Sequence, residues 1–259
     1  MPSAMATLFD LDRKTAMVTG ASAGLGEHFA RTLAAHGARV ALAARRRDRL
    51  EVVVDAIRAG GGSALAVEMD VTDGESVRAG FAAAADELGP IDVTVNNAGI
   101  SITKPALDLL ESDWDRVVDT NLRGAWLVAQ TAARALVTAR RGGRIINVGS
   151  IVGLRTIGQL APYAAAKAGL THLTHVLAME WARHGIQVNA IAPGYIETDL
   201  NRPFWSTPAG KRLIERIPQR RVGQPRDLDG ALLLLASDAG AFMAGSVLVV
   251  DGGHTVNTL

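Results

Sequence analysis

Two side chains, Tyr163 and Lys167, are spaced for proton-transfer chemistry. They stand in the stretch 161–167, Ala-Pro-Tyr-Ala-Ala-Ala-Lys, where the proline suits the first turn of a helix and the alanines favour its continuation. Residues four apart on a helix lie on one face, one turn from each other. An ammonium group at that position stabilises the phenolate, and a tyrosine with a lowered pKa transfers protons more readily at neutral pH. Taken alone, the pair also fits an ordinary buried tyrosine and a lysine whose amine reaches water.

A glycine-rich turn follows the first expected strand, Thr15–Thr19, and opens the first expected helix, Gly24–His36. Its glycines are spaced Gly-x3-Gly-x-Gly, which allows a tight turn and brings backbone N–H groups at the helix N-terminus close to a diphosphate. The alternative is an ordinary strand-to-helix turn, but the position at the first βα junction argues against it. The residues expected to contact a dinucleotide here are Gly20, Ser22, Ala23, Gly24, Leu25 and Gly26.

The end of the second expected strand, Arg39–Ala44, favours NADP(H) over NAD(H). An acidic residue about 20 positions beyond the glycine turn would bind the ribose 2′-hydroxyl of NAD. This chain instead continues with Arg45, Arg46 and Arg47, and a guanidinium group is a bidentate partner for a 2′-phosphate. We therefore expect Arg45 to hold that phosphate, although arginines are also common on the first turn of a helix.

Strands and helices alternate along the whole chain. Further strands are expected at Ser63–Glu68, Ile91–Val95, Arg144–Val148, Ile186–Ala192 and Ser246–Val250, and further helices at Arg47–Ala59, from Asp73 to Leu88, at Ser112–Ala139, from Tyr163 to about His184, and at Asp227–Ser237. This alternation predicts one α/β domain over residues 1–259, a doubly wound seven-stranded parallel sheet with helices on both faces. The proline-containing segment 198–221 interrupts the rhythm, which indicates a small lid over a ligand site.

The composition excludes several kinds of site and partner. Of the 259 residues, 48% are apolar and 20% charged, as in a globular protein with a sizeable core, and the net charge of +1 gives no reason to expect nucleic acid or an anionic membrane as partner. The absence of cysteine excludes disulfides and thiolate metal sites. The six histidines are scattered, so no metal site is expected. Neither a secretion signal nor a membrane-length apolar run is visible, and we expect a cytoplasmic protein.

Motifs along essentially the whole chain resemble those of the short-chain dehydrogenase/reductase family. They are the Thr19–Gly26 turn, Asn96-Asn97-Ala98-Gly99, Asn121 in Asn-Leu-Arg-Gly, Ser150, Tyr163-x3-Lys167, Pro193-Gly194 with Thr198, and Val250-Asp251-Gly252-Gly253. Each motif is weak alone, but their order and their places at strand ends make the set specific. The resemblance implies a single-domain Rossmann fold and an NAD(P)-dependent oxidoreductase that interconverts ketones and secondary alcohols.

The resemblance also implies four catalytic residues. Tyr163 would give its proton to the substrate carbonyl oxygen, Ser150 would hydrogen-bond the same oxygen, and Lys167 would lower the Tyr163 pKa and bind the nicotinamide ribose. Asn121 would hold a water molecule that links Lys167 to solvent. The other cofactor contacts implied, beside Tyr163 and Lys167, are Asp70, Val71, Asn96, Ala98, Gly99, Pro193, Gly194, Ile196 and Thr198.

A small neutral carbonyl or alcohol is the expected substrate, because the candidate pocket residues are mostly apolar. The positive charge of Arg155 is the one feature that argues against a neutral substrate. The candidates are Ser101, Ile102, Val152, Leu154, Gln159, Leu160, Tyr195, Phe204 and Trp205. Phe204 and Trp205 fit the interior of the lid equally well. Within the family, a 3-oxoacyl-ACP reductase and a sugar-acid or polyol dehydrogenase stay open as alternatives.

A non-catalytic dinucleotide-binding scaffold or sensor is the alternative from a different class of protein. Such a protein would be expected to lose Tyr163 or Lys167, and this chain keeps both. The family assembles through its long helices and last strand. The corresponding stretches here are long and apolar, so we expect a homo-oligomer, and specifically a homotetramer.

Overall fold

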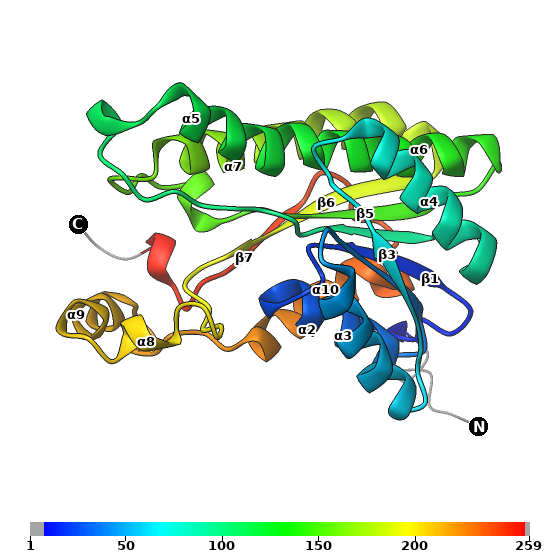
Figure 1. The fold of residues 1–259 in the computed structure, drawn as a ribbon, viewed down its shortest axis with the longest axis horizontal. Helices are drawn as coiled ribbons and strands as arrows, with labels where there is room; N and C mark the ends of the chain where they lie inside the picture. The colour runs from blue at the N-terminus through cyan, green and yellow to red at the C-terminus, as the bar shows by residue number, and fades with distance from the viewer. Residues whose placement is uncertain (1–7, 257–259) are drawn as a thin grey trace.

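A seven-stranded parallel sheet in the order β3-β2-β1-β4-β5-β6-β7 runs through the computed structural model, which describes residues 8–256 (Figure 1). The strands are β1 Thr15–Thr19, β2 Arg39–Ala44, β3 Ser63–Glu68, β4 Val93–Asn96, β5 Gly143–Val148, β6 Ile186–Pro193 and β7 Val247–Val250. Each neighbouring pair is parallel, so all carboxyl ends meet at one edge. The strand order reverses between β1 and β4, and a crevice at such a reversal is where open α/β sheets bind ligands.

The strands read as continuous apolar runs in the sequence because helices bury both faces of the sheet. Helices α2 (Gly24–Ala35), α3 (Arg47–Ala59) and α10 (Asp229–Ala236) cover one face, and α4 (Gly74–Leu88), α6 (Gly124–Thr138) and α7 (Ala161–Trp181) cover the other (Figure 1). Phe29 and Leu33 lie in the first of the two resulting cores, and Phe81 and Leu177 in the second. The predicted doubly wound α/β fold is confirmed.

The prediction of one continuous helix over Ser112–Ala139 is wrong, because the helix is interrupted. The structure divides it into α5 (Glu111–Val118), a π-helical turn (Asp119–Arg123) and α6. A π turn inserts one residue into the helical repeat. Here the insertion turns Asn121 inward, where its side chain accepts a hydrogen bond from the Ile100 N–H and donates one to the Ile100 carbonyl, both at 2.8 Å. The distortion therefore ties the helix to the loop after β4.

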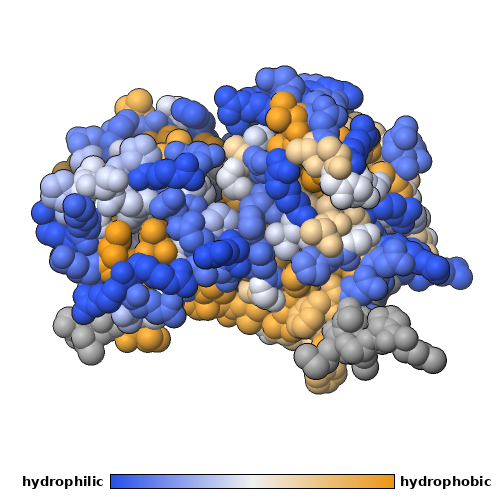
Figure 2. All heavy atoms as spheres, turned by 90° about the horizontal axis from the view of Figure 1, so that it is seen from below, coloured by the Kyte–Doolittle hydropathy of each residue, from blue (hydrophilic) through white to orange (hydrophobic). Residues whose placement is uncertain are grey.

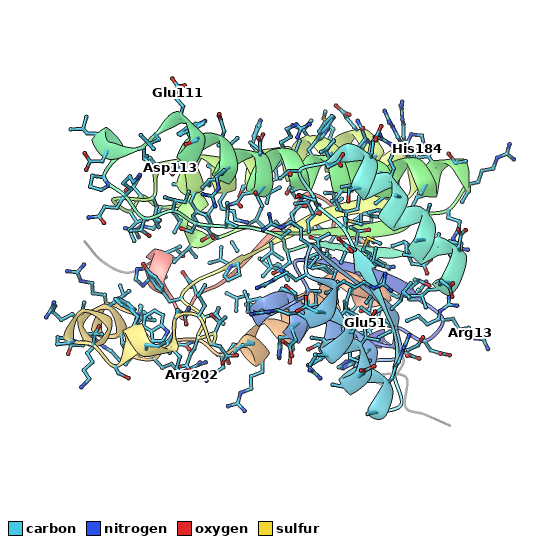
Figure 3. The ribbon with its side chains drawn as sticks, viewed as in Figure 1. Arg13, Glu51, Glu111, Asp113, His184 and Arg202 are labelled. Carbon is cyan, nitrogen blue, oxygen red and sulfur yellow. The ribbon has the colours of Figure 1, made fainter. Side chains whose placement is uncertain are left out.

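The segment 198–221 contains two short helices, α8 (Arg202–Trp205) and α9 (Pro208–Arg216), beside the C-terminal 3₁₀ turn His254–Val256 (Figure 1). Pro203 and Pro208 lie in the first turns of these helices, where a missing N–H costs nothing. Arg202, labelled in Figure 3, pairs with Glu197 at 3.0 Å and Asp199 at 2.9 Å. These ion pairs fasten α8 to the end of the stretch that follows β6.

The remaining element boundaries lie within a few residues of those expected. The Tyr163 helix begins at Ala161 and its last turn, Ala182–His184, is 3₁₀. The final helix starts with a 3₁₀ turn, Pro225–Leu228, before α10. Within residues 8–256, no helix has both the length and the apolar character needed to cross a membrane.

Candidate active site

A cleft of about 480 Å³ opens at the carboxyl ends of β1, β2 and β4, beside the strand-order reversal. Its walls are Gly20, Ser22, Ala23, Gly24, Leu25, Ala43, Ala44, Arg45, Arg46, Met69, Asp70, Val71, Asn97, Ala98, Gly99, Ile100, Thr120, Thr198, Asp199 and Leu200. Most of the residues expected to contact a dinucleotide therefore line one continuous cleft.

The glycine turn is shaped by backbone conformation and by close packing. Gly20 and Gly24 have φ of 66° and 60°, in the left-handed region that favours glycine. A Cβ on Gly26 would lie 2.3 Å from the Gly20 carbonyl oxygen, so Gly26 lets α2 approach the turn and does not line the cleft. A Cβ on Gly24 would meet only Thr198, at 3.7 Å, across open space. The cradle at the N-terminus of α2 thus suits a diphosphate.

Of the two adjacent asparagines at the end of β4, Asn97 lines the cleft and the predicted Asn96 does not. Asn96 is 3% exposed, and its amide donates to the Ala125 carbonyl and to Asn147 Oδ1, both at 3.0 Å, beneath the sheet edge. Asn97 lines the cleft and donates to the Thr19 carbonyl at 3.0 Å. Because side chains alternate along a strand, only one of the two can face the ligand.

Three further predicted contacts lie behind the cleft. Pro193 ends β6 in the interior, and Ile196 is buried where the chain bridges to Gly223. Gly194 packs so closely that a Cβ there would lie 2.7 Å from Asp251 Cα. These residues shape the backbone that leads to Thr198, which does line the cleft.

Positive charge gathers where β2 ends. Arg45 and Arg46 are exposed on the cleft wall, and Arg46 Nη2 donates to Ser22 Oγ at 3.2 Å, which joins the glycine turn to the arginines. Burial acts to raise the pKa of Asp70, but hydrogen bonds from Thr72 and the nearby Arg45 charge outweigh burial and hold that pKa below its usual value. Arg47 instead pairs with Glu51, labelled in Figure 3, along α3 at 3.2 Å.

The four predicted catalytic residues come from three elements. Tyr163 and Lys167 lie on α7, Ser150 follows β5, and Asn121 lies on the π turn. Lys167 is 4% exposed, and its Nζ donates to the Val148 carbonyl at 2.7 Å and lies 5.7 Å from the centre of the Tyr163 ring. A Cβ on Gly99, in the cleft wall, would lie 3.2 Å from Asn121 Oδ1 and 3.7 Å from Lys167 Nζ. Asn121 and Lys167 therefore lie directly behind that glycine of the cleft wall.

The expected lowering of the Tyr163 pKa by Lys167 is contradicted. Burial raises the pKa of Tyr163, and a hydrogen bond with Ser150 offsets this only in part. Burial also lowers the pKa of Lys167 from 10.5 to about 8. The physical reason is that both charged forms lose their water, and the Lys167 ammonium is directed to a strand carbonyl.

The expected substrate residues separate into different places. Val152 and Tyr195 line a pocket of about 180 Å³ together with Ile151, Arg155, Thr156, Ile157, Leu213, Arg216 and His254. Leu213, Arg216 and His254 were missed, because they come from α9 and the C-terminal turn and carry no local motif. Within residues 8–256, no group of three or more His, Asp or Glu side chains is placed to hold a metal ion.

Trp205 belongs to the interior of the 198–221 segment. It is 8% exposed, its indole N–H donates to Asn201 Oδ1 at 3.0 Å, and it packs edge-on against Tyr195 and Phe204. Phe204 is 40% exposed. The sequence left open whether Phe204 and Trp205 contact substrate or lie inside the 198–221 segment, and the structure places Trp205 inside it.

The other candidates line neither the cleft nor the pocket beside Val152. Ser101, Leu154 and Gln159 are exposed, while Ile102 and Leu160 are half-buried. Gln159 has φ of 65°, and its carbonyl accepts from the Lys104 N–H at 2.9 Å. Lys104 also pairs with Asp113, labelled in Figure 3, at 2.6 Å, which links the loop before Pro105 to α5.

Comparison with known proteins gives matches over almost the whole chain. The family described as Enoyl-(Acyl carrier protein) reductase matches residues 20–255. Gluconate 5-dehydrogenase of Gluconobacter oxydans (strain 621H) is 39% identical over 251 residues, which cover 96% of this chain and 98% of that protein. The 3-oxoacyl-(acyl-carrier-protein) reductase of Escherichia coli (strain K12) is 37% identical over 244 residues, covering 94% of this chain and 98% of that protein.

Solved structures give the same result. The crystal structure of a gluconate 5-dehydrogenase from Burkholderia cenocepacia J2315, in complex with NADP and tartrate, has a TM-score of 0.93 at 37% identity and covers 98% of this chain and 100% of that one. Identities above 30% across nearly full lengths carry the family's CH–OH oxidoreductase chemistry to this chain. The chain belongs to the short-chain dehydrogenase/reductase family.

Proposed function

We propose that the protein transfers hydride between NADP(H) and a small substrate, reducing a ketone to a secondary alcohol and catalysing the reverse oxidation. The observation that carries the proposal is the clustering of Ser150, Tyr163, Lys167 and Asn121. Asn121 and Lys167 of this cluster lie behind Gly99 in the wall of the glycine-turn cleft. NADPH, when bound, supplies the hydride. The residues of the chain supply the proton, the orientation and the exclusion of water.

Two hydroxyl groups are available to a substrate carbonyl oxygen. Burial keeps Tyr163 in its protonated form, so its hydroxyl holds a proton to donate. Ser150 Oγ accepts from the Val152 N–H at 3.2 Å and is hydrogen-bonded to Tyr163, and we infer that its O–H turns to the substrate oxygen when a substrate binds. Two donors aimed at one oxygen stabilise the negative charge that develops there as hydride arrives.

Lys167 and Asn121 support this pair. Only one of the Lys167 ammonium hydrogens is used by the Val148 carbonyl, and a pKa of about 8 lets the amine gain and lose a proton near neutral pH. We infer that Lys167 returns a proton to Tyr163 and binds ribose hydroxyls. Asn121 holds the Ile100 backbone against the π turn beside Lys167, and the second hydrogen of its amide remains for a water molecule.

The proposal includes NADP(H) as cofactor, supported by Arg45 and Arg46 on the cleft wall and by Ala44 in place of an acidic residue. A charge-assisted hydrogen bond to the 2′-phosphate contributes enough that Arg45→Gln is expected to raise the KM for NADPH about 10- to 100-fold. The KM for NADH should not change. Steady-state kinetics with both cofactors measure this, with Arg49→Gln, exposed on α3 away from the cleft wall, as the matched control. A wild-type preference for NADH would contradict the proposal.

We also propose that the segment 198–221 acts as a lid. Thr198, Asp199 and Leu200 line the cofactor cleft, while Leu213 and Arg216 line the smaller pocket beside Val152. One segment thus borders both the cofactor cleft and the expected substrate position, which supports a role in excluding water during the reaction.

The direct test of the function is NADPH oxidation with a panel of ketones. Because the relatives include proteins named for gluconate and for 3-oxoacyl-(acyl-carrier-protein) reduction, the panel contains keto-sugar acids, 3-oxoacyl thioesters and aryl ketones. Turnover of at least one class supports the proposal. Binding of NADPH without turnover of any ketone would favour the non-catalytic scaffold.

We also propose that four copies of the chain assemble into a homotetramer. Apolar side chains are exposed on the outer helices, in the turn before β7 and on edge strand β7, namely Trp114, Trp126, Val137, Met179, Phe242 and Val249. On the opposite side of the molecule from α5, α6 and α7, seen from below, Figure 2 shows further apolar residues along one margin. Extended apolar surface of this kind marks contacts between proteins. Light scattering after size exclusion should give a mass four times that of the 27.1 kDa chain; a monomer would contradict the expectation.

A further inference from the structure

A chain of buried amide and hydroxyl groups joins β4 to α7 through β5. Asn96 Nδ2 donates to Asn147 Oδ1 at 3.0 Å, and Asn147 Nδ2 donates to Thr174 Oγ1 at 2.9 Å. The Thr174 hydroxyl in turn donates to the Leu170 carbonyl at 2.8 Å. Asn147 is 1% exposed and Thr174 is 0% exposed. The two side chains therefore join a strand to a helix at a place that solvent does not reach.

Polar side chains at these two positions are not needed to fill the core. Ile145, two residues earlier on β5, and Leu177, one turn later on α7, belong to the apolar second core. Apolar residues of similar shape at the Asn147 and Thr174 positions would avoid the cost of removing polar groups from water. A buried polar network with its hydrogen bonds made specifies one arrangement of the elements that it joins. We therefore look for its purpose in how α7 is oriented.

The network attaches α7 to β5 at a second place. Thr174 follows Lys167 by seven residues, which is two helical turns and about 10 Å along the axis, on the same face of the helix. Lys167 Nζ donates to the Val148 carbonyl, and Asn147, the residue before Val148, donates to Thr174. Two consecutive residues of β5 thus hold α7 at two points along its length.

Two attachments limit a motion that one attachment allows, because a helix held at one point can still tilt about that point. Tyr163 lies one turn before Lys167 and is hydrogen-bonded to Ser150, which stands two residues after the end of β5. A tilt of α7 against β5 would change the distance between these two hydroxyl groups. The hydrogen bond to Thr174 opposes that tilt from the other side of Lys167.

We propose that Asn147 and Thr174 are positioning residues, which align Tyr163 with Ser150 by setting the orientation of α7 on β5. The inference rests on the proposed function, because it assigns this alignment to the transfer of a proton. Neither Asn147 nor Thr174 lines the cofactor cleft or the pocket beside Val152. Their removal is therefore expected to slow the chemical step and to leave cofactor binding unchanged.

Thr174→Val tests the proposal, because it keeps the branched shape and removes the oxygen that accepts from Asn147. The single-turnover rate of NADPH oxidation, with the best substrate of the ketone panel, is measured by stopped flow. We expect this rate to fall about 10- to 100-fold, since a misplacement of about 1 Å can cost about 100-fold. The Kd for NADPH should not change. Thr174→Ser, which keeps the hydroxyl, should recover the rate of the wild type.

Thr131→Val is the matched control. Thr131 lies on α6, and its hydroxyl donates to the Leu127 carbonyl at 2.9 Å, four residues earlier, as the Thr174 hydroxyl does on α7. Among residues 8–256, no strand donates a hydrogen bond to Thr131. Urea unfolding measures the stability that each variant loses. A normal rate in Thr174→Val would overturn the inference, and so would an equal loss of rate in Thr131→Val or a slow Thr174→Ser.

A second pair of variants breaks the same attachment from the strand, should Thr174→Val fail to fold. Asn147→Leu is compared with Asn189→Leu. Asn189, 2% exposed on β6, donates to the Met243 carbonyl at 2.9 Å and accepts from the Ser246 N–H at 2.8 Å, so it holds the turn before β7. We expect Asn147→Leu to slow the reaction and Asn189→Leu to lose stability without slowing it. Equal rates in the two variants would overturn the inference.

If no ketone is turned over, the proposed function fails while the attachment of α7 is still decided by hydrogen exchange. Deuterium uptake by peptides from residues 161–173 is followed by mass spectrometry in the wild type, Thr174→Val and Thr131→Val. Faster uptake in Thr174→Val alone supports a role of Thr174 in holding this part of α7. Uptake that matches the wild type, or that rises equally in Thr131→Val, overturns it.

Discussion

Tyr163→Phe is expected to lower kcat by about 10²- to 10⁴-fold, the contribution of a positioned general acid. The substitution removes one buried oxygen that hydrogen-bonds Ser150 and keeps the ring that packs over Lys167. NADPH affinity should therefore change little. Stopped-flow or steady-state NADPH oxidation gives kcat, and quenching of protein fluorescence gives the cofactor Kd.

Tyr195→Phe is the matched control, since Tyr195 is the other of the two tyrosines in the chain. Tyr195→Phe also loses a phenol oxygen, but from the wall of the pocket beside Val152, where we assign no proton transfer. This variant should therefore alter KM more than kcat. Near-normal turnover by Tyr163→Phe, or equal losses in both variants, would show that another group donates the proton.

Lys167→Met is expected to change how folding stability depends on pH. Burial places the Lys167 pKa at about 8 in the fold against 10.5 in the unfolded chain. Between these values the unfolded state binds the proton and the folded state does not, so stability rises with pH through this window. Below about pH 8 the buried charge costs the wild type about 3 kcal/mol relative to pH above 10.5, at about 1.4 kcal/mol per pKa unit. Methionine fills a similar volume and carries no such cost.

Urea unfolding of both proteins at about pH 7 and about pH 10.5, at one protein concentration, isolates this effect as the change in their stability difference. The variant should gain on the wild type at the lower pH. Parallel pH dependence in the two proteins would mean that the amine keeps its ordinary pKa in the fold. Turnover by the variant should also fall, because the Tyr163 proton loses its source.

The strands could be predicted because each is a short buried run that ends at a turn signal. Thr15–Thr19 and Arg39–Ala44 were placed with the bounds that the structure has. The π turn at Asn121 could not be predicted, because Ser112–Ala139 keeps a helical pattern through it and the cause is a tertiary contact with Ile100. A local pattern does not contain the partner that distorts it.

The residues of the candidate site also fall into a group that the sequence could predict and a group that it could not. Tyr163, Lys167 and Ser150 carry motifs and lie together. Arg216 and His254 carry no motif and line the pocket beside Val152 only because the chain folds there. The Tyr163 pKa was predicted in the wrong direction because spacing on a helix says nothing about how much water is removed. The sequence could not show which of Asn96 and Asn97 lines the cleft, because both belong to one motif and strand pleating decides which side chain faces it.

The bond between Lys167 and the Val148 carbonyl fixes the register of α7 along β5. Helix α7 cannot slide or rotate without breaking a hydrogen bond of a buried ammonium, so the reactive groups keep their mutual geometry when other regions change. Leu213 and His254, which line the pocket beside Val152, lie on α9 and the C-terminal turn, outside that fixed frame. We therefore expect mutations there to change the shape of this pocket while the groups that transfer the proton stay in place, a separation that would let the same scaffold accept different substrates.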